Sequence, residues 1–335
     1  MKKNWISILT LLLVAGLTAL LLTACRKMSD SSDIEPDESK APTMQGDVIV
    51  PELPDELVME EGLPILTVYN TATESIDEMD IERYVMGVLA GEMRNDWPME
   101  ALKAQAILAR TFVLKFIDEK ESRYDGADIS TDITEAQAYD AERINERVEK
   151  AVNDTRGEVL SVNGELPYAW FHAHAGGKTE LPTLALDYKE PDPFYTQVVE
   201  SPDSDKAPTS VKNWSAAFTA DEVAQAAKES GVDVGKITGI ELGEKGESGR
   251  TIYFLINGQK VSAPSLRVHL DSTKLKSTLL SSVSLDGDKI TFEGSGHGHG
   301  VGMSQWGVYG MAEQGKTAEE IVAHYFKDVG VAKVW

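Results

Sequence analysis

One acidic side chain, Glu92, ends a run of apolar and small residues, Val85-Met-Gly-Val-Leu-Ala-Gly. A carboxyl group in such surroundings is either satisfied by good partners or kept for chemistry, because loss of water raises its pKa. Gly87 and Gly91 precede it one turn apart and leave room for another group to approach closely. A solvated glutamate at a helix end is the common alternative. Glu92 is therefore our first candidate for a catalytic acid, to be judged with its neighbours.

A second candidate is the glycine-dense stretch Gly294-Ser-Gly-His-Gly-His-Gly-Val-Gly-Met-Ser-Gln-Trp. Five glycines among residues 294–302 indicate backbone conformations that other residues avoid, or a backbone laid against a ligand. The alternative is a flexible surface loop. The stretch lacks the Gly-Lys-Ser/Thr of a phosphate loop and the Gly-x-Ser-x-Gly of a nucleophile elbow, so a triad of Ser304 with His297 is disfavoured. Its polar side chains still suggest a binding site on a rigid frame: His297, His299, Ser304 and Gln305.

Histidines occur in two His-x-His pairs, His172/His174 and His297/His299. Together they could hold a metal such as zinc. Hydrogen bonding in a polar cleft is the favoured reading, and no His-Glu-x-x-His motif is present. We expect no cofactor, with zinc on His172 and His174 as the alternative.

Composition limits the possible partners and chemistry. The net charge of −23 argues against nucleic acid as a partner. The single cysteine, Cys25, lies in a targeting segment, so the folded part has no disulfide, cysteine nucleophile or cysteine-based zinc site.

The N-terminus, residues 1–25, has the features of an export signal. Lys2 and Lys3 precede an uncharged run from Trp5 to Ala24. The sequence Leu22-Thr-Ala-Cys25 resembles a lipoprotein box, in which Cys25 would be lipidated; an uncleaved membrane anchor remains the alternative. Either one places the bulk of the chain outside the cytoplasm, tethered to a membrane.

Residues 26–62 are rich in Ser, Asp, Glu and Pro and predict a disordered acidic linker. The globular region is then 63–335, beginning with a strand at 65–69. Asp80 is placed to cap a helix over residues 81–93. Asn95 and Asp96 supply a break and a second cap, and Pro98 begins a helix that runs to about residue 119.

The second helix of this pair has an apolar face made by Leu102, Ala106, Ala109, Val113 and Phe116. Gln105 lies at its edge, and Lys103 and Arg110 share a flank. Further on, a helix is expected at 141–153, hairpins at 158–173 and 251–262 with Asn-Gly turns at 163–164 and 257–258, a helix from 221, a short helix to 270, a strand at 289–293 and helices at 305–314 and 318–326. Thr317 and Glu320 would form a capping box for the last of these helices. The fold class is α+β: the helical pair carrying Glu92 packs with β-hairpins and the glycine-rich loop in one large region, with room for a smaller inserted subdomain.

Three ordered blocks resemble the signature of the stage II sporulation protein D family, which includes amidase-enhancer proteins. They are GVLAGEM, WPMEALKAQAILART and GHGHGVGMSQWGVYGMAEQGKTAEEIVAHYF. The resemblance covers roughly residue 63 to the end of the sequence. It implies a membrane-tethered, extracytoplasmic lytic transglycosylase of peptidoglycan glycan strands, which acts during sporulation at the septum and engulfing membrane.

The same resemblance implies roles for individual residues and partners. Glu92 takes the place of the catalytic acid, and Lys103, Gln105, Arg110, Ser304 and Gln305 are expected near the sugar. The partners implied are an amidase (stage II sporulation protein P), which strips stem peptides, and a membrane protein (stage II sporulation protein M). Some relatives bind zinc through cysteines after the first hairpin; here that region is FHAHAGGKTE, without cysteine.

The residues suit a reaction that needs one carboxylate. Glycoside hydrolysis by paired carboxylates needs an acid and a separate nucleophile or base, and no equally placed second carboxylate is found. Glu92 could serve as acid and then as base. Two alternatives stay open: a non-catalytic wall-binding protein that stimulates an amidase, and a metal-dependent hydrolase that uses the histidine pairs.

Overall fold

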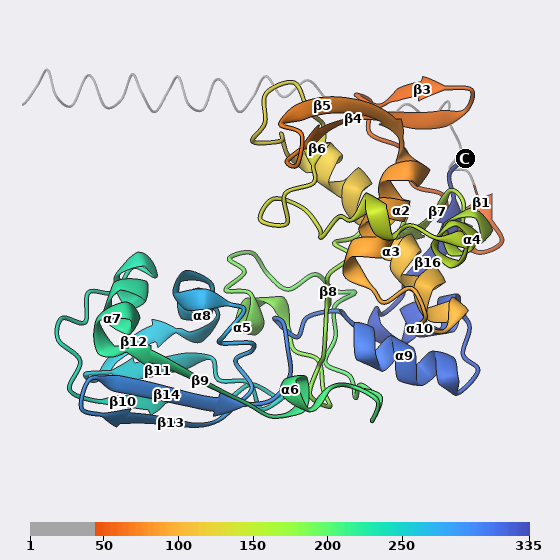
Figure 1. The fold of residues 1–335 in the computed structure, drawn as a ribbon. Helices are drawn as coiled ribbons and strands as arrows, with labels where there is room; N and C mark the ends of the chain where they lie inside the picture. Colours follow the sequence, from red (N-terminus) through yellow and green to blue (C-terminus); the bar gives the residue numbers. More distant parts are fainter. Residues whose placement is uncertain (1–43) are drawn as a thin grey trace, which may run out of the picture. The chain divides into compact units, whose positions relative to one another are not determined.

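The computed structural model of the 335-residue chain describes residues 44–335 (Figure 1). Helices and several small sheets alternate along this part, which confirms the α+β class. Two separate groups of buried apolar side chains form two cores. The first core holds the helical pair, and the second is built within residues 214–292. Both cores belong to one compact unit, which agrees with the single large region expected from the sequence.

The helical pair forms the centre of the first core. Helices α2 (Ile81–Glu92) and α3 (Met99–Glu119) pack together. Asp80 caps α2, accepting a hydrogen bond from the Arg83 amide at 2.9 Å, as predicted. The predicted apolar face of α3 is buried throughout: Leu102, Ala106, Ala109, Val113 and Phe116.

The predicted second cap is wrong. Pro98 itself is the N-cap of α3, and no side chain of residues 44–335 caps this helix. Asp96 is instead paired with Arg94, and the Asn95 amide donates to the Arg143 carbonyl. Proline pre-sets the backbone for helix entry, so a side-chain cap is dispensable here.

A small sheet leads into α2. Strands β3 (Val58–Glu60), β4 (Leu63–Asn70) and β5 (Ser75–Asp80) are antiparallel, and β6 (Ile129–Ser130) pairs with β4 in parallel. The strand expected at 65–69 is thus confirmed within β4. Because β5 ends at the cap of α2, the sheet fixes where the helix carrying Glu92 begins.

The hairpin expected at 158–173 is wrong in its pairing. Its turn forms, with Asn163 and Gly164 both at positive φ and Val162 bridged to Glu165. However, β7 (Glu158–Ser161) pairs with β16 (Gly330–Lys333), and β8 (Phe171–His172) pairs in parallel with β15 (Met303–Ser304). Turn chemistry is local, whereas strand partners far along the chain are chosen by packing.

The helix expected at 141–153 is divided into a short 3₁₀ turn, η1 (Ala141–Arg143), and α4 (Glu146–Asp154). Asn145 separates them, because its side chain accepts hydrogen bonds from the first amides of α4. Helices α9 (Gln305–Glu313) and α10 (Ala318–Tyr325) pack against α3, and Thr317 and Glu320 form the predicted capping box.

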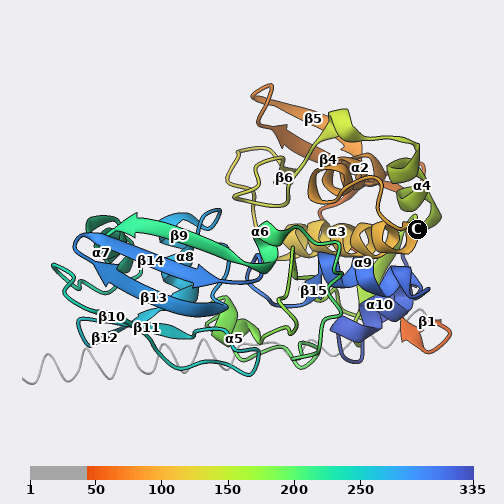
Figure 2. The ribbon, with the colours of Figure 1, turned by 60° about the horizontal axis from the view of Figure 1, so that its bottom comes forward.

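The second core lies between two three-stranded sheets and two helices. One sheet has β9 (Trp214–Thr219), β14 (Lys289–Gly294) and β13 (Leu280–Asp286), seen side by side in Figure 2. The other has β10 (Ile240–Leu242), β11 (Tyr253–Ile256) and β12 (Gln259–Ser262). Helices α7 (Ala220–Glu229) and α8 (Ala263–Asp271) pack on each other.

Most predicted elements of this core are confirmed. The hairpin at 251–262 appears as β11 and β12, and Ser262 caps α8. Strand β9 was not predicted, although its sequence WSAAFT alternates buried and exposed residues. Two short helices, α5 (Pro182–Ala185) and α6 (Thr209–Lys212), interrupt the loop between the cores.

The linker prediction for residues 26–62 fails over 44–62. There β1 (Met44–Gln45) pairs with β2 (Val48–Ile49), and the Ile49 carbonyl accepts a hydrogen bond from Ser161. The polar composition of this segment gave no indication of these contacts. The export segment, Cys25 and linker residues 26–43 lie outside the described residues. Every helix among residues 44–335 is too short or too polar to cross a bilayer.

Candidate active site

A cleft of about 480 Å³ opens at the end of α2 that carries Glu92. Side chains from both cores and from the glycine-rich loop line it. Among the residues lining this described cleft, Glu92 is the only carboxylate. The polar lining residues are Glu92, Gln137, His172, Arg267, Ser272, Thr273, His297, His299 and Gln305.

The Glu92 carboxyl group is held by two donors. Its Oε1 accepts a hydrogen bond from the Ala138 amide at 2.7 Å, and its Oε2 lies 3.4 Å from Gln305 Nε2. Burial raises the pKa of Glu92 above its ordinary value, and the two hydrogen bonds oppose this only in part. Glu92 is thus a half-buried carboxyl group with a shifted proton affinity, facing a cleft.

Three buried polar atoms around Glu92 have no protein partner in the described structure. They are Gln105 Nε2, Gln137 Oε1 and His172 Nε2. Gln305 connects the first of these side chains to the acid, since its Nε2 lies 3.5 Å from Gln105 Oε1. Gln137 and His172 line the cleft, whereas Gln105, which was expected near the sugar, is fully buried and is not among the lining residues. An unpaired buried polar group costs about 1–3 kcal/mol, so the two lining atoms favour a ligand rich in hydroxyl and amide groups or ordered water.

Two predicted sugar contacts, Lys103 and Arg110, do not reach the cleft. They share a flank of α3 as predicted, but this flank faces the end of α4 and the start of β7. Lys103 pairs with Asp154 at 3.2 Å. Arg110 is fully buried, 2.6 Å from Glu82 Oε2, and also donates to the Glu158 carbonyl at 2.8 Å. Arg110 therefore belongs to the protein interior, and Lys103 lies at the edge of that interior.

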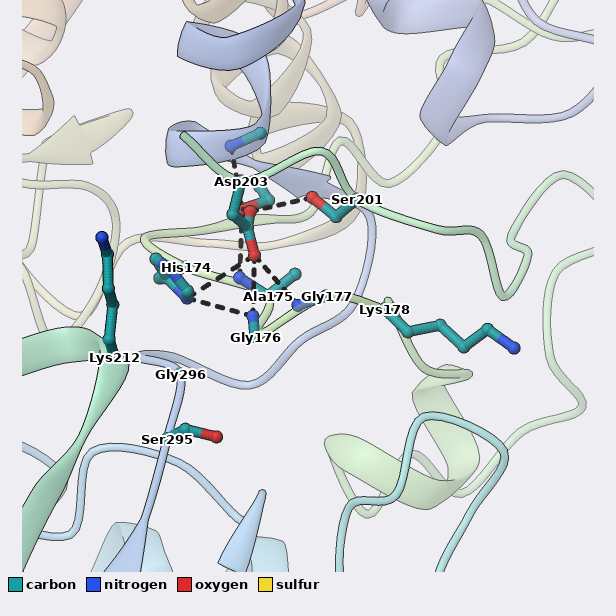
Figure 3. A network of polar contacts seen from close by, with 12 residues as sticks. His174, Ala175, Gly176, Gly177, Lys178, Ser201, Asp203, Lys212, Ser295 and Gly296 are labelled. Atoms are coloured by element: carbon teal, nitrogen blue, oxygen red, sulfur yellow. Dashed lines mark hydrogen bonds and ion pairs between the residues drawn. The ribbon is translucent and has the colours of Figure 1, made fainter. Parts of the chain in front are cut away.

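Ser304 is likewise held away from the cleft, by Asp203. Its hydroxyl donates to Asp203 Oδ1 at 2.7 Å and, as N-cap of α9, accepts from the Gly307 amide. The other Asp203 oxygen accepts from the amides of Gly176 and Gly177 at 2.8 and 3.1 Å (Figure 3). Asp203 thus holds its own segment, residues 176–177 and Ser304 together. Because Ser304 immediately precedes Gln305 in the chain, this contact positions the Gln305 side chain.

The glycine-rich loop is a rigid element. Gly296, Gly298, Gly300 and Gly302 all have positive φ, as five closely spaced glycines suggested. A Cβ on Gly302 would lie 2.2 Å from the Trp170 carbonyl oxygen. His297 and His174 exchange backbone hydrogen bonds of 2.9 Å, so the loop lies against residues 170–174. The close approach is to protein backbone.

Of the four histidines in the two His-x-His pairs, three line the cleft (His172, His297 and His299), whereas His174 lies beside Asp203. Burial lowers the pKa of His297 to about 4 and that of His299 to about 3, with Arg267 adding to each shift. The rings are therefore neutral near pH 7 and suited to hydrogen bonding. Among residues 44–335 no three His, Cys, Asp or Glu side chains converge on one point as metal ligands. The donor set thus does not fit zinc.

Sequence reasoning missed the cleft's cation. Arg267, from α8 of the second core, lines the cleft with its guanidinium donating to the Leu275 and Ser272 carbonyls at 2.9 and 3.2 Å. Burial lowers its pKa to about 10. Phe112 and Trp170 supply the apolar wall. No sequence motif marks Arg267, because its place depends on how the second core meets the loop.

We predict that Gly91→Ala disturbs the acid without removing it. A Cβ at Gly91 would lie 2.7 Å from the backbone of Ala138, whose amide donates to Glu92. The 136–139 segment must shift, so we expect catalysis to fall by roughly 10–100-fold, as for a misplaced catalytic group. The measurement is kcat/KM for the reaction proposed below. Ala90→Gly serves as a control for helix propensity, and equal losses in both variants would contradict the steric argument.

We also predict a stability change below neutral pH from His172. Its burial, with smaller contributions from His299 and Arg250, lowers the His172 pKa well below its ordinary value. Below about pH 6.5 the His172 ring is protonated in the unfolded chain but still neutral in the folded protein. The contribution of His172 to the free energy of unfolding is therefore fully present above about pH 6.5 and is lost as the pH falls.

The slope of the free energy of unfolding against pH tests whether His172 causes this loss of stability. We expect His172→Gln to make the free energy of unfolding decline less steeply below about pH 6.5, by up to ~1.4 kcal/mol per pH unit. Urea unfolding at a series of pH values measures it. Identical slopes for wild type and variant would contradict the assignment.

Comparison with known proteins gives a consistent family. Residues 69–161 match the family model described as stage II sporulation protein, and residues 170–302 match one described as a domain of unknown function. An uncharacterized protein of Brachyspira hyodysenteriae is 32% identical over 264 residues, covering 78% of this chain and 69% of that protein. The amidase enhancer of Bacillus subtilis is 28% identical over 287 residues, covering 72% of this chain and 39% of that protein.

The stage II sporulation protein D of Bacillus subtilis is 31% identical over 288 residues. This similarity covers 80% of the present chain and 79% of that protein. The match extends well beyond any single motif. The protein therefore belongs to the stage II sporulation protein D family of sporulation proteins.

Proposed function

We propose that the protein is a lytic transglycosylase that cleaves the bond between N-acetylmuramic acid and N-acetylglucosamine in peptidoglycan glycan strands. One observation carries the proposal: the described cleft contains a single carboxyl group, Glu92, whose pKa is raised by burial. A raised pKa keeps more of the acid form available near neutral pH, which a proton donor to a leaving oxygen requires.

The proposed reaction uses Glu92 twice. In the first step the protonated carboxyl group gives its proton to the glycosidic oxygen, whose bond to the muramic anomeric carbon breaks. The substrate's acetamido oxygen supports the positive charge that develops there. In the second step the Glu92 carboxylate removes the proton of the muramic 6-hydroxyl, whose oxygen attacks the anomeric carbon. A 1,6-anhydro ring forms, no water is consumed, and Glu92 is protonated again.

The number of carboxylates distinguishes this reaction from ordinary hydrolysis. Retaining and inverting glycosidases use two carboxyl groups, about 5–9.5 Å apart, on opposite sides of the scissile bond. Among the residues that the structure describes, those lining the cleft around Glu92 are histidines, glutamines and Arg267 where a second carboxylate would be needed. With the histidine rings neutral, these side chains can position sugar hydroxyl and acetamido groups by hydrogen bonds.

The products of digestion test the proposal. Glycan strands without stem peptides are incubated with the wild-type protein and analysed by mass spectrometry in ¹⁸O-labelled water. We expect products that end in 1,6-anhydromuramic acid, lack the mass of one water and carry no ¹⁸O. Reducing-end products with ¹⁸O would show hydrolysis and contradict the transglycosylase proposal.

The cellular setting belongs to the same proposal. An extracytoplasmic protein tethered through its N-terminus, by Cys25 lipidation or an anchor, would meet the glycan at the engulfing membrane. An amidase of the stage II sporulation protein P type would supply stripped strands, and a stage II sporulation protein M would be the membrane partner. Co-purification of tagged protein with these partners from sporulating cells tests this setting.

A second candidate function is stimulation of an amidase without glycan cleavage. It is favoured by the similarity to a relative named amidase enhancer. An amidase assay with added wild-type protein or Glu92→Gln separates the two. Equal stimulation by both proteins, with no anhydro products from either, would favour the enhancer. A metal-dependent hydrolase is less well supported, since the described histidines do not converge as a ligand set.

A further inference from the structure

A second groove, of about 390 Å³, adjoins the cleft that holds Glu92. Phe112, Ala169 and Trp170 line both hollows, so the two share a wall. The remaining lining of the second groove comes from the C-terminal half of α3, residue 168 and the loop after α5. A polymer bound in the cleft can therefore continue into this groove along one surface.

The floor of the groove is a set of aromatic rings. Tyr168 and Trp170 are stacked, with ring centroids 4.9 Å apart and an interplanar angle of 23°. Tyr188 stands nearly perpendicular to both, at 6.2 Å from Tyr168 and 5.6 Å from Trp170. All three side chains are partly exposed. Two stacked rings, with a third standing nearly perpendicular to them, give the groove an aromatic floor.

The rim of the groove is polar and includes Lys120, whose ammonium group lies 5.8 Å from the centroid of the Phe116 ring. The Tyr168 hydroxyl donates to Glu119 at 2.7 Å, and Lys115 pairs with Glu119 at 2.8 Å. Lys120 is exposed, and within residues 44–335 no carboxylate lies within 4.0 Å of its ammonium group. In a chain of net charge −23, an exposed lysine beside an aromatic floor, with no carboxylate of residues 44–335 within salt-bridge distance, indicates an anionic group on the ligand.

We propose that this groove is a binding subsite for the same glycan strand, holding the sugars that extend beyond the bond at Glu92. A pyranose ring presents a flat face of C–H groups that packs on an aromatic ring, and its hydroxyls meet a polar rim. Once its stem peptide is removed, a muramic residue carries a free lactyl carboxylate, which suits Lys120. The inference rests on the proposed glycan substrate and assigns the class of ligand in the second groove.

Binding by strand length tests the groove separately from catalysis. All proteins carry Glu92→Gln, so strands stay intact, and calorimetry compares stripped strands with a short oligosaccharide that fills the cleft alone. Tyr188 lines the groove but not the cleft. We expect Tyr188→Ala to lower the ratio of long-strand to short-oligosaccharide affinity by about tenfold, as for loss of one stacked ring. Phe194→Ala, an exposed ring of the same loop outside the groove, should leave the ratio unchanged.

A charge reversal tests the lactyl carboxylate. We expect Lys120→Glu to weaken binding of stripped strands by about three- to tenfold and to spare chitin oligomers of equal length, which carry no carboxylate. Lys236→Glu, at an exposed lysine outside both hollows, is the matched control. Because Lys120 is exposed, its variant should fold normally, which circular dichroism checks.

The results that overturn the proposal are distinct from those that overturn catalysis. Unchanged length ratios in Tyr188→Ala and equal binding by Lys120→Glu would remove the subsite and leave cleavage by Glu92 untouched. If the variants weaken only strands that still carry stem peptides, the groove binds peptide and the glycan assignment is wrong. Conversely, wild-type protein that makes no anhydro products but shows the length effect would retain the subsite and lose the transglycosylase.

Discussion

Glu92→Gln is expected to lower kcat/KM on stripped glycan strands by about 10⁴-fold and to abolish detectable 1,6-anhydro products. General acid–base catalysis contributes roughly 10²–10⁴-fold for one positioned group, and here one side chain has both roles. Glutamine keeps the shape and can still lie against Ala138 and Gln305, so the fold should persist. Glu78→Gln, at an exposed position of β5, is the matched control. Unchanged products from Glu92→Gln would refute the assignment.

The pH dependence gives a second measure of the same side chain. The first step needs the protonated acid, and burial raises the Glu92 pKa. We therefore expect kcat/KM to remain high above the usual pKa of a glutamic acid, about 4.3, and to fall as the pH rises through the elevated value. The neutral histidines titrate lower, so they should add no step near pH 7. If activity instead rises with pH in this range, the reaction requires a deprotonated group, which would contradict the role of Glu92 as the protonated acid.

The second large effect is expected from Glu82→Ala, which should lower the free energy of unfolding by about 3–5 kcal/mol, the usual cost of leaving a buried charge without its partner. Glu82 is 3% exposed, and its Oε2 lies 2.6 Å from Arg110. Its Oε1 accepts hydrogen bonds from the Gly157 amide at 2.9 Å and from Trp335 Nε1 at 3.0 Å. The substitution would thus leave the buried Arg110 guanidinium without its carboxylate, and the two donors without an acceptor. Urea unfolding measures the loss.

A double variant and an activity measurement separate this structural role from substrate binding. Glu82→Ala/Arg110→Met removes both charges and should recover part of the lost stability, because an unpaired cation is no longer buried. KM measured on folded protein should stay close to the wild-type value in both variants. A raised KM with unchanged stability would return Arg110 to the substrate site that the family resemblance implied.

Local sequence features determined much of this protein. Asp80 before an apolar run, the Thr317/Glu320 capping box and the Asn257-Gly258 turn each act over a few residues, and each formed as predicted. The glycine spacing in 294–302 specified the positive φ values of the loop. Glu92 could be proposed as the acid for the same reason, since the residues just before it already describe an apolar environment.

The tertiary structure decided which distant residues these elements contact. Periodicity on α3 placed Lys103 and Arg110 on a common flank but could not say that this flank faces Asp154 and Glu82. Pairing of β7 with β16 joins residues about 170 positions apart, which no local turn specifies. Ser304 was bound to Asp203, and Arg267 entered the cleft from the second core.

The physical reason is the range of the interactions. Caps, turns and helical faces depend on neighbours within one or two turns, so the sequence alone determined them. The same local information was enough to propose Glu92 as the acid. The contents of the cleft depend on contacts between residues far apart in the sequence, such as Ala138 and Gln305, which lie 46 and 213 positions from Glu92. Only folding brings those donors to the carboxyl group, and their geometry together with burial decides its pKa.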